Sequence, residues 1–195
     1  MFILYAVVIG TLLGLLGRGR IERLGELPIR WAPLALLGLA GQIVLFAGPV
    51  GDAIDPDIGR YLYVSSTALV LGVVLANLRL PGLPIIAAGA ALNLVAILAN
   101  GGSMPTDPNA LEAAGRRLPE AFSNSVVVAS PALQPLTDVF ALPSWVPFAN
   151  VFSIGDVVIF VGLVVAIAAG MRTVPDESGR VAEARVANVD HGVGR

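Results

Sequence analysis

The stretch SIGDVVIFVGLVVAIAAGM, residues 153–171, decides the fold class of this chain. Beyond Asp156 it carries no charged side chain, and an apolar run of this length is typical of a helix that crosses a bilayer. Ser153 can cap such a helix, with Asp156 three residues later in the arrangement of a capping box. We therefore expect a membrane helix over about residues 154–171.

Four further apolar runs precede this stretch, at about residues 2–16, 31–50, 61–78 and 85–99. Of the 195 residues, 56% are hydrophobic and only 13% are charged, whereas soluble domains are about one quarter charged. This composition excludes an ordinary water-soluble globule. It predicts an all-α, polytopic bundle of about five transmembrane helices within residues 1–172.

Missing residue types exclude several kinds of chemistry. The chain has no cysteine, and its one histidine, His191, lies in a polar tail, so thiolate sites, histidine triads and multi-histidine metal sites are excluded. The net charge of −2 and the lack of a long basic patch argue against nucleic-acid binding. We expect no metal and no cofactor.

The distribution of arginine predicts the orientation of the bundle. With the N-terminus outside, nine arginines fall on inward segments and three on outward ones, which is a clear positive-inside bias. The outward three are Arg60, Arg116 and Arg117. We therefore expect five membrane spans, with the N-terminus outside and the C-terminus inside. Residues 173–195 mix charges with little apolar surface and are expected to form a disordered cytoplasmic tail.

Residues 100–153 form the one long outer segment, with seven of the fourteen prolines. Thr106 or Asp107 can cap a short helix that starts at Pro108 and continues through about residues 110–117. From Phe122 onward the segment is apolar again, and its prolines prevent a continuous sixth helix. We expect it to lie along the outer interface and to cover the mouth of the bundle.

Candidate site residues flank this outer segment. The run Asn100-Gly101-Gly102-Ser103-Met104-Pro105 ends the fourth apolar run. Its glycines fit either a helix C-cap or a nest of backbone amides that binds an anion or carboxylate. Asp138 is a lone carboxylate among apolar neighbours, and Asp156 opens the last apolar run.

We expect the polar and small residues inside the apolar runs to take part in the packing of helices against one another. Gln42, Asn77 and Asn93 are expected to face the bundle interior and to join helices by hydrogen bonds. A stripe of small residues runs along the last span at four-residue spacing, namely Gly162, Ala166 and Gly170. Such a stripe serves either packing within the chain or self-association in the membrane.

The motifs Asn100–Pro105 and Ser153–Asp156 resemble those of an uncharacterised bacterial family of small integral membrane proteins, a domain of unknown function. In that family they recur as Asn-Gly-Gly-x-Met-Pro and Ser-Ile-Gly-Asp, and the resemblance extends to about Met171. It implies a multi-pass protein of the bacterial cytoplasmic membrane and supplies no activity.

A second resemblance carries chemistry. Lipoprotein signal peptidases, which are aspartyl membrane peptidases, have an Asn-x-Gly element, an Asp-Phe stretch, and an Asn-x-Ala-Asp element opening the last span. This chain has Asn100-Gly101-Gly102, then Asp138 and Asp156 eighteen residues apart. It departs from the pattern at Ser153 and Gly155, and no two spans separate the Asn-Gly element from Asp138.

Two functions therefore stay open from sequence. In the first, the chain is not an enzyme, and its outer cap binds a partner protein or membrane lipid. In the second, Asp138 and Asp156 form the acid–base pair of a membrane hydrolase. In that hydrolase a set of neighbouring residues would position a membrane-anchored substrate: Asn100, Gly101, Gly102, Met104 and Ser153. Asn100 or the glycine amides would supply the oxyanion donor.

Overall fold

A computed structural model describes residues 3–46, 53–117 and 125–172 of the chain. The expected disordered tail, residues 173–195, lies outside the described residues, as does the end of the second apolar run.

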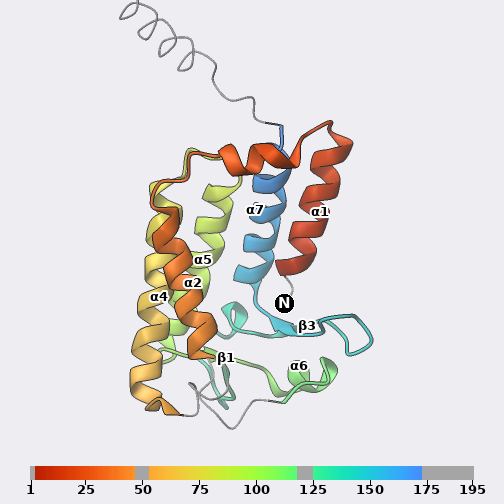
Figure 1. Cartoon of the computed structure of the whole chain (residues 1–195). Coiled ribbons are helices and arrows are strands. Elements are labelled where there is room, and N and C mark those ends of the chain that lie inside the picture. The colour runs from red at the N-terminus through yellow and green to blue at the C-terminus, as the bar shows by residue number, and fades with distance from the viewer. Residues whose placement is uncertain (1–2, 47–52, 118–124, 173–195) are drawn as a thin grey trace, which may run out of the picture.

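Five long apolar helices form the body of the structure (Figure 1). They are α1 (Ile3–Leu16), α2 (Ala32–Leu45), α4 (Pro56–Ala76), α5 (Leu83–Ala99) and α7 (Ile154–Gly170). Each predicted helix is confirmed as a helix. Helix α4 starts before the predicted residue 61, because the Asp55 carboxylate accepts hydrogen bonds from the Asp57 and Ile58 amides and Pro56 occupies the first turn.

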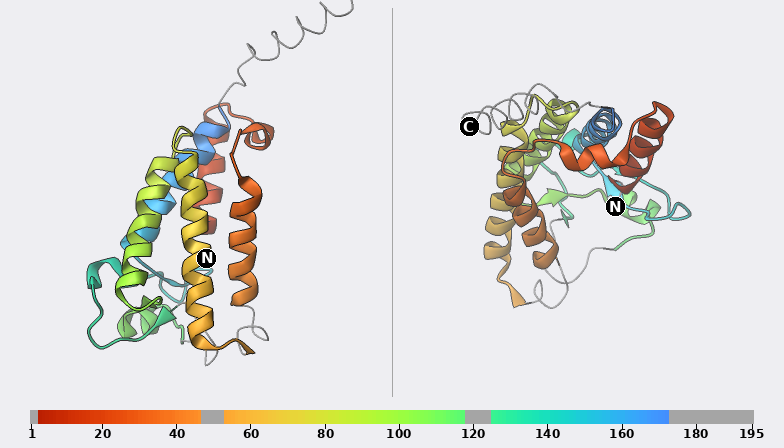
Figure 2. Two further views of the ribbon diagram at one scale, coloured as in Figure 1. Left: turned by 90° about the vertical axis from the view of Figure 1, so that its left-hand side faces the viewer. Right: turned by 45° about the horizontal axis from the view of Figure 1, so that its top comes forward.

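These helices pack side by side in the order α2, α4, α5, α7, α1, so that α1 and α7 are neighbours (Figures 1 and 2). Helix α2 is held to α4 partly by Gln42, whose amide nitrogen donates to the Ser66 and Thr67 hydroxyls at 3.1 Å each. The expectation of interhelical hydrogen bonding by Gln42 is thus confirmed.

The most extensive helix contact joins α5 and α7 and depends on glycine. A Cβ atom at Gly162 would lie 2.7 Å from the backbone nitrogen of Ile86, and one at Gly89 would lie 2.5 Å from the carbonyl oxygen of Gly155. Gly170 likewise faces Leu24 and Leu27. The stripe of small residues therefore packs within the chain, and a second copy would have to use another face.

One end of the bundle carries a cap of loops and short elements, and the other carries a short linker (Figure 1). The cap contains helix α6 (Pro108–Ala113), the 3-10 turn η2 (Gln134–Leu136) and four two-residue strands. The strands are β1 (Met104–Pro105), β2 (Ser125–Val126), β3 (Phe140–Ala141) and β4 (Val151–Phe152). Either Thr106 or Asp107 was predicted to cap α6, and the structure shows that Asp107 does. The helix ends before the predicted residue 117.

The linker at the opposite end contains the 3-10 helix η1 (Ile21–Glu26) and lies between α1 and α2. Asn77, expected inside a span, instead forms the C-cap of α4 at this end. Its side chain is buried and bonds to the backbone of Arg30, which belongs to the linker. The polar residue therefore joins a helix end to a loop.

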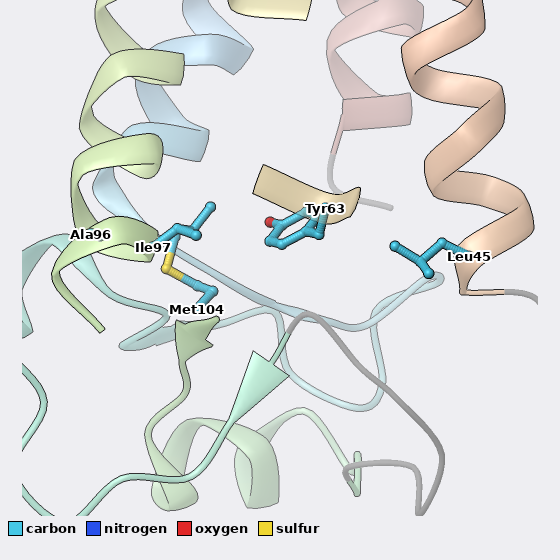
Figure 3. Close-up of a cluster of buried hydrophobic side chains, with 5 residues drawn as sticks. All are labelled: Leu45, Tyr63, Ala96, Ile97 and Met104. Atoms are coloured by element: carbon cyan, nitrogen blue, oxygen red, sulfur yellow. The ribbon is translucent and has the colours of Figure 1, made fainter. Parts of the chain in front are cut away.

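A hydrophobic cluster anchors the cap to the helices (Figure 3). Its five buried members come from α2, α4, α5 and β1, and they are Leu45, Tyr63, Ala96, Ile97 and Met104. Met104 is 4% exposed, so this residue, predicted to position substrate, forms part of the core that fixes β1 against the end of α5.

Candidate functional site

Pairing of β3 with β4 brings Asp138 towards the start of α7. The two strands are antiparallel with Phe140 opposite Phe152, and the two rings stack with centroids 5.6 Å apart. Asp138 precedes β3 by two residues, and α7 begins two residues after Phe152. The antiparallel register therefore places Asp138 beside the first turn of the helix that carries Asp156.

The segment after β1 holds Asp138 from the other side. The Asp138 amide donates to the Pro105 carbonyl at 3.0 Å, and the Asp107 amide donates to the Asp138 carbonyl at 3.0 Å. These two bonds form a parallel bridge between Thr106 and Asp138. Both predicted motifs thus meet at one place, because the Asn-Gly-Gly-Ser-Met-Pro run supports the backbone of Asp138 and the Ser-Ile-Gly-Asp run supplies Asp156.

Asp156 belongs to a network of three side chains. It forms a capping box with Ser153, whose hydroxyl accepts from the Asp156 amide at 3.0 Å and whose amide donates to the Asp156 carboxylate at 3.1 Å. Asn93 of α5 donates to the other carboxylate oxygen at 2.7 Å and accepts from the Ser153 hydroxyl at 2.8 Å. The predicted capping box is confirmed.

Gly155 explains why this network can form across two helices. A Cβ atom at position 155 would collide with Oδ1 of Asn93, so the glycine of the Ser-Ile-Gly-Asp motif admits the amide side chain. Three residues of the motif therefore have separate roles: Ser153 caps α7, Gly155 leaves space for the Asn93 side chain, and Asp156 supplies the carboxyl group. Asn93, expected only to join helices, becomes a direct partner of Asp156.

Asp138 is 8% exposed and has no salt-bridge partner among the described residues. Burial raises the pKa of Asp138 from its ordinary value of 3.8 to about 7, assisted by the negative charge of Asp156 and opposed by the Thr106 hydroxyl. Near neutral pH Asp138 is therefore protonated in a substantial fraction of the molecules, whereas the two carboxyl oxygens of Asp156 accept hydrogen bonds from Asn93 and Ser153.

Thr106 is a member of the site that sequence reasoning considered only as a helix cap. It is 3% exposed, and its Oγ1 has no hydrogen-bond partner of ordinary geometry within the described ranges. The unpaired hydroxyl lies near enough to Asp138 to act on its pKa. The residues next to Thr106 in sequence do not indicate that it belongs to the site, because the bridge joins it to Asp138, which is 32 residues away.

The predicted oxyanion donors are engaged elsewhere. The Asn100 amide nitrogen donates to the carbonyl oxygens of Ala96 and Ala132, at 2.8 and 2.9 Å. The backbone amides of Gly101 and Gly102 donate to Leu98 and Ile97 at the end of α5. Both glycines have positive φ, so the helix C-cap explains them, and their amides are not free to form the predicted nest.

A small cleft of about 150 Å³ opens beside the Thr106–Asp138 bridge. Thr106 and Thr137 line it together with the apolar segment 127–129 after β2. In the part of the chain that the structure describes, no group of three His, Cys, Asp or Glu side chains gathers as it would around a metal ion. The polar side chains next to the two aspartates are the hydroxyls of Thr106 and Ser153 and the amide of Asn93.

The fold and the site together define a helical protein with one capped end, where the buried Asp138 lies close enough to the half-buried Asp156 for the charge of Asp156 to act on it. One described helix, α4, is long and apolar enough to cross a membrane, and α1, α2, α5 and α7 are apolar but shorter. Residues 26–168 match the model of DUF5317, a family of unknown function, and the chain belongs to that family. No curated protein and no solved structure matches it.

Proposed function

We propose that the protein is a multi-pass membrane protein of the bacterial cytoplasmic membrane in which α1, α2, α4, α5 and α7 all cross the bilayer. Support comes from the surface of these helices, where large apolar side chains are exposed, among them Leu12, Leu36 and Ile43 at 55%, 66% and 71%. Such surface on several parallel helices is unfavourable in water and is covered by lipid in a membrane. The 14 residues of α1 and of α2 reach about 21 Å, so the bilayer thins locally around them.

Charge supports an orientation with the cap outside. Arg18, Arg20, Arg23 and Arg30 lie in the linker between α1 and α2, at the end opposite the cap. Asp55 and Asp57 lie at the start of α4, at the cap end. The positive-inside rule then places the linker in the cytoplasm.

Single-cysteine labelling tests this topology, because the natural chain has no cysteine. Gly25 in the linker faces open space and Asn109 on α6 is exposed, so Gly25→Cys and Asn109→Cys leave the packing unchanged. In intact cells an impermeant maleimide should label the cysteine at 109, whereas the one at 25 should react only after the membrane is opened. Equal labelling of both in intact cells would contradict the proposal.

We further propose that the carboxyl pair is a hydrolytic site that acts on a membrane-anchored peptide. The observation that carries this function is the buried Asp138, whose pKa of about 7 reflects burial and the charge of Asp156 beside it. Acid–base hydrolysis by an aspartate pair requires one carboxyl group that can give a proton, and Asp138 meets this condition near neutral pH. The depth just beneath the cap, at the end of the apolar helices, suits a substrate held in the bilayer.

The roles follow from protonation. The Asp156 carboxylate takes a proton from water, the water oxygen bonds to the peptide carbonyl carbon, and the proton of Asp138 passes to the carbonyl oxygen. The resulting diol then loses its amine when the C–N bond breaks and the amine nitrogen takes the proton from Asp156; a hydroxyl proton returns to Asp138. Asn93 and Ser153 position Asp156 throughout.

New amino termini provide the test, since peptide hydrolysis creates them. Wild-type protein and its variants in nanodiscs are incubated with membranes from a strain that lacks the gene, and new termini are identified by amine labelling and mass spectrometry. Asp138→Asn and Asp156→Asn should abolish the new termini, whereas Asp57→Asn, at an exposed carboxylate, should not. Identical termini from wild type and Asp138→Asn, or none from wild type between pH 5 and 8, would disprove the activity.

A second function, binding of a partner protein or lipid through the cap, is favoured by a different observation. Aromatic side chains of the cap are exposed, with Trp145 at 82% and Phe148 at 55%. Tyr5 of α1 also donates a hydrogen bond to the Pro147 carbonyl, which fixes this part of the cap to the bundle. A photo-crosslinking residue at position 145 should capture a single protein or lipid; labelling spread over many membrane proteins would contradict specific binding.

A further inference from the structure

A cleft of about 440 Å³ lies at the linker end of the bundle, opposite the carboxyl pair. Its walls are Pro28 and Arg30 from the linker and residues 75–80 from the end of α4 and the turn towards α5. Two of these residues are arginines, Arg30 and Arg79, and most of the others are apolar. The cleft therefore combines positive charge with a hydrophobic wall.

Asn77 builds this cleft by fastening one wall to the other. Its amide oxygen accepts from the Arg30 backbone amide at 2.8 Å, and its amide nitrogen donates to the Arg30 carbonyl at 2.9 Å. The same nitrogen donates to the Val73 carbonyl at 2.7 Å, so the side chain is tied to its own helix as well. The backbone of Arg30 is thus fixed, and Arg79 follows two residues after the anchoring asparagine.

The guanidinium groups of these two arginines are available to an anion. The ion pairs of the described chain are Arg20–Glu22 and Arg60–Asp57, so neither Arg30 nor Arg79 has a carboxylate partner there. The Arg30 guanidinium lies over the ring of Trp31, 5.6 Å from its centroid. Arg23 and Arg172, by contrast, donate to the carbonyl oxygens of Arg172 and Leu13.

The surrounding charge is strongly positive. The described linker, the turn after α4 and the end of α7 hold six arginines and two glutamates. The arginines are Arg18, Arg20, Arg23, Arg30, Arg79 and Arg172, and the glutamates are Glu22 and Glu26. An excess of this size draws anionic groups to the whole end, and two of the cations, Arg30 and Arg79, line the cleft.

We propose that this cleft binds the phosphodiester headgroup of an anionic membrane lipid. Arg30 and Arg79 contact the phosphate, Leu75 and Leu78 pack against the upper part of an acyl chain, and Trp31 lies at the headgroup level. The inference rests on the proposed membrane topology and is independent of the proposed hydrolysis, since the two sites lie at opposite ends of the bundle.

Fluorescence quenching of Trp31 tests the proposal. The chain has two tryptophans, and Trp145→Phe, at an exposed position, leaves Trp31 as the reporter. The protein is placed in nanodiscs of phosphatidylcholine and phosphatidylglycerol in which only one of the two lipids is brominated. Brominated phosphatidylglycerol should quench Trp31 more strongly than the same fraction of brominated phosphatidylcholine.

Two pairs of substitutions with equal charge change separate the cleft from its surroundings. Arg30→Gln with Arg79→Gln should lower the relative affinity for phosphatidylglycerol about fivefold per arginine. Arg18→Gln with Arg20→Gln removes the same charge from the same end outside the cleft and should retain most of the preference. An equal loss in both pairs would overturn the proposal, because attraction would then belong to the surface as a whole.

Inorganic phosphate distinguishes the lipid from a free anion. Phosphate should leave the quenching by brominated phosphatidylglycerol unchanged relative to chloride at the same ionic strength, because it lacks the acyl chain that packs on Leu75 and Leu78. Reversal of the quenching by phosphate would show that the cleft takes a free anion, which overturns the lipid assignment. The two earlier proposals are tested separately: cysteine labelling shows whether the membrane topology is wrong, and the search for new amino termini shows whether the hydrolase activity is absent.

Discussion

The side chains of Asn77 and Asn100 make the same three hydrogen bonds at the ends of consecutive helices, α4 and α5. Each amide nitrogen donates to the carbonyl four residues earlier in its helix and to the carbonyl of a distant loop residue, and each amide oxygen accepts from that residue's backbone amide. The loop residues are Arg30 and Ala132. Asparagine at a helix C-cap thus fastens the linker at one end of the protein and the cap at the other.

Asn100→Ala should release the cap. The substitution removes the two hydrogen bonds to the Ala132 backbone; because Ala132 is exposed and water can replace the lost partner, the free energy of unfolding should fall by about 1 kcal/mol. Hydrogen exchange of the Ala132 amide should rise, whereas Asn109→Ala, on the exposed face of α6, should change neither quantity. Unchanged exchange at Ala132 would show that the cap is held by other contacts.

Asp138→Asn should change how stability depends on pH. The folded protein has a pKa of about 7 at Asp138, above the unfolded value of 3.8, so the folded state binds the extra proton between these limits. The unfolding free energy of the wild type therefore falls as pH rises from about 4 to about 7, by up to about 4 kcal/mol.

The asparagine variant lacks this contribution, and thermal unfolding in detergent should show it more stable than the wild type at pH 8. The advantage should shrink towards pH 5, where wild-type Asp138 is already protonated. Asp57→Asn serves as the control, because Asp57 is exposed and pairs with Arg60. A parallel pH profile for wild type and Asp138→Asn would contradict the raised pKa.

Gly162→Ala should separate α5 from α7. The added methyl group would lie 2.7 Å from the Ile86 backbone nitrogen and 2.9 Å from the Gly82 carbonyl oxygen, and neither backbone atom can move aside cheaply. Overpacking of this kind costs about 1–3 kcal/mol. Gly72→Ala on α4, where no atom lies within 4 Å, should be neutral. Equal melting temperatures for the two variants would contradict the close contact.

Asn93 and Ser153 should be energetically coupled. Loss of the Ser153 cap costs about 1 kcal/mol, and loss of Asn93 removes the acceptor of the Ser153 hydroxyl proton and the donor to one oxygen of the Asp156 carboxyl group. In a double-mutant cycle of Asn93→Ala and Ser153→Ala, the interaction energy should be at least about 0.5 kcal/mol. Simple additivity of the two effects would show that the hydrogen bond between them contributes little.

Charge-free apolar runs predicted the long helices well, and the agreement is closest where a run ends at a turn residue. The run at residues 85–99 corresponds to α5, Leu83–Ala99, and the run at 154–171 corresponds to α7, Ile154–Gly170. The start of α4 was misplaced because Asp57 and Arg60 interrupt the apolar pattern while remaining helical. Local composition determines where such a helix forms, and capping residues determine where it begins.

The cap and much of the site depend on partners that are distant in sequence. The strand β1 is two residues long and has no alternating pattern; it exists because Met104 pairs with Ser125 across the cap. The unpaired Thr106 hydroxyl and the bonds from Asn100 to Ala132 have the same origin. The two aspartates could be selected from sequence since each is a carboxylate in an apolar setting, whereas Asn93 is recognised as the partner of Asp156 only when α5 and α7 are packed together.

The packing of α1 on α7 has a consequence for biogenesis. Ala6, Gly10 and Gly14 are the buried residues of α1, and Gly10 and Gly14 lie against Ile167 and Met171 of the α7 region. During translation α1 leaves the ribosome well before α7, so the glycine face of α1 has no packing partner while the intervening helices are made. In the membrane topology proposed above, α1 is a lone short helix in the bilayer until α7 is made, and it is then accessible to insertases and quality-control proteases. Completion of the chain is thus the event that closes the bundle.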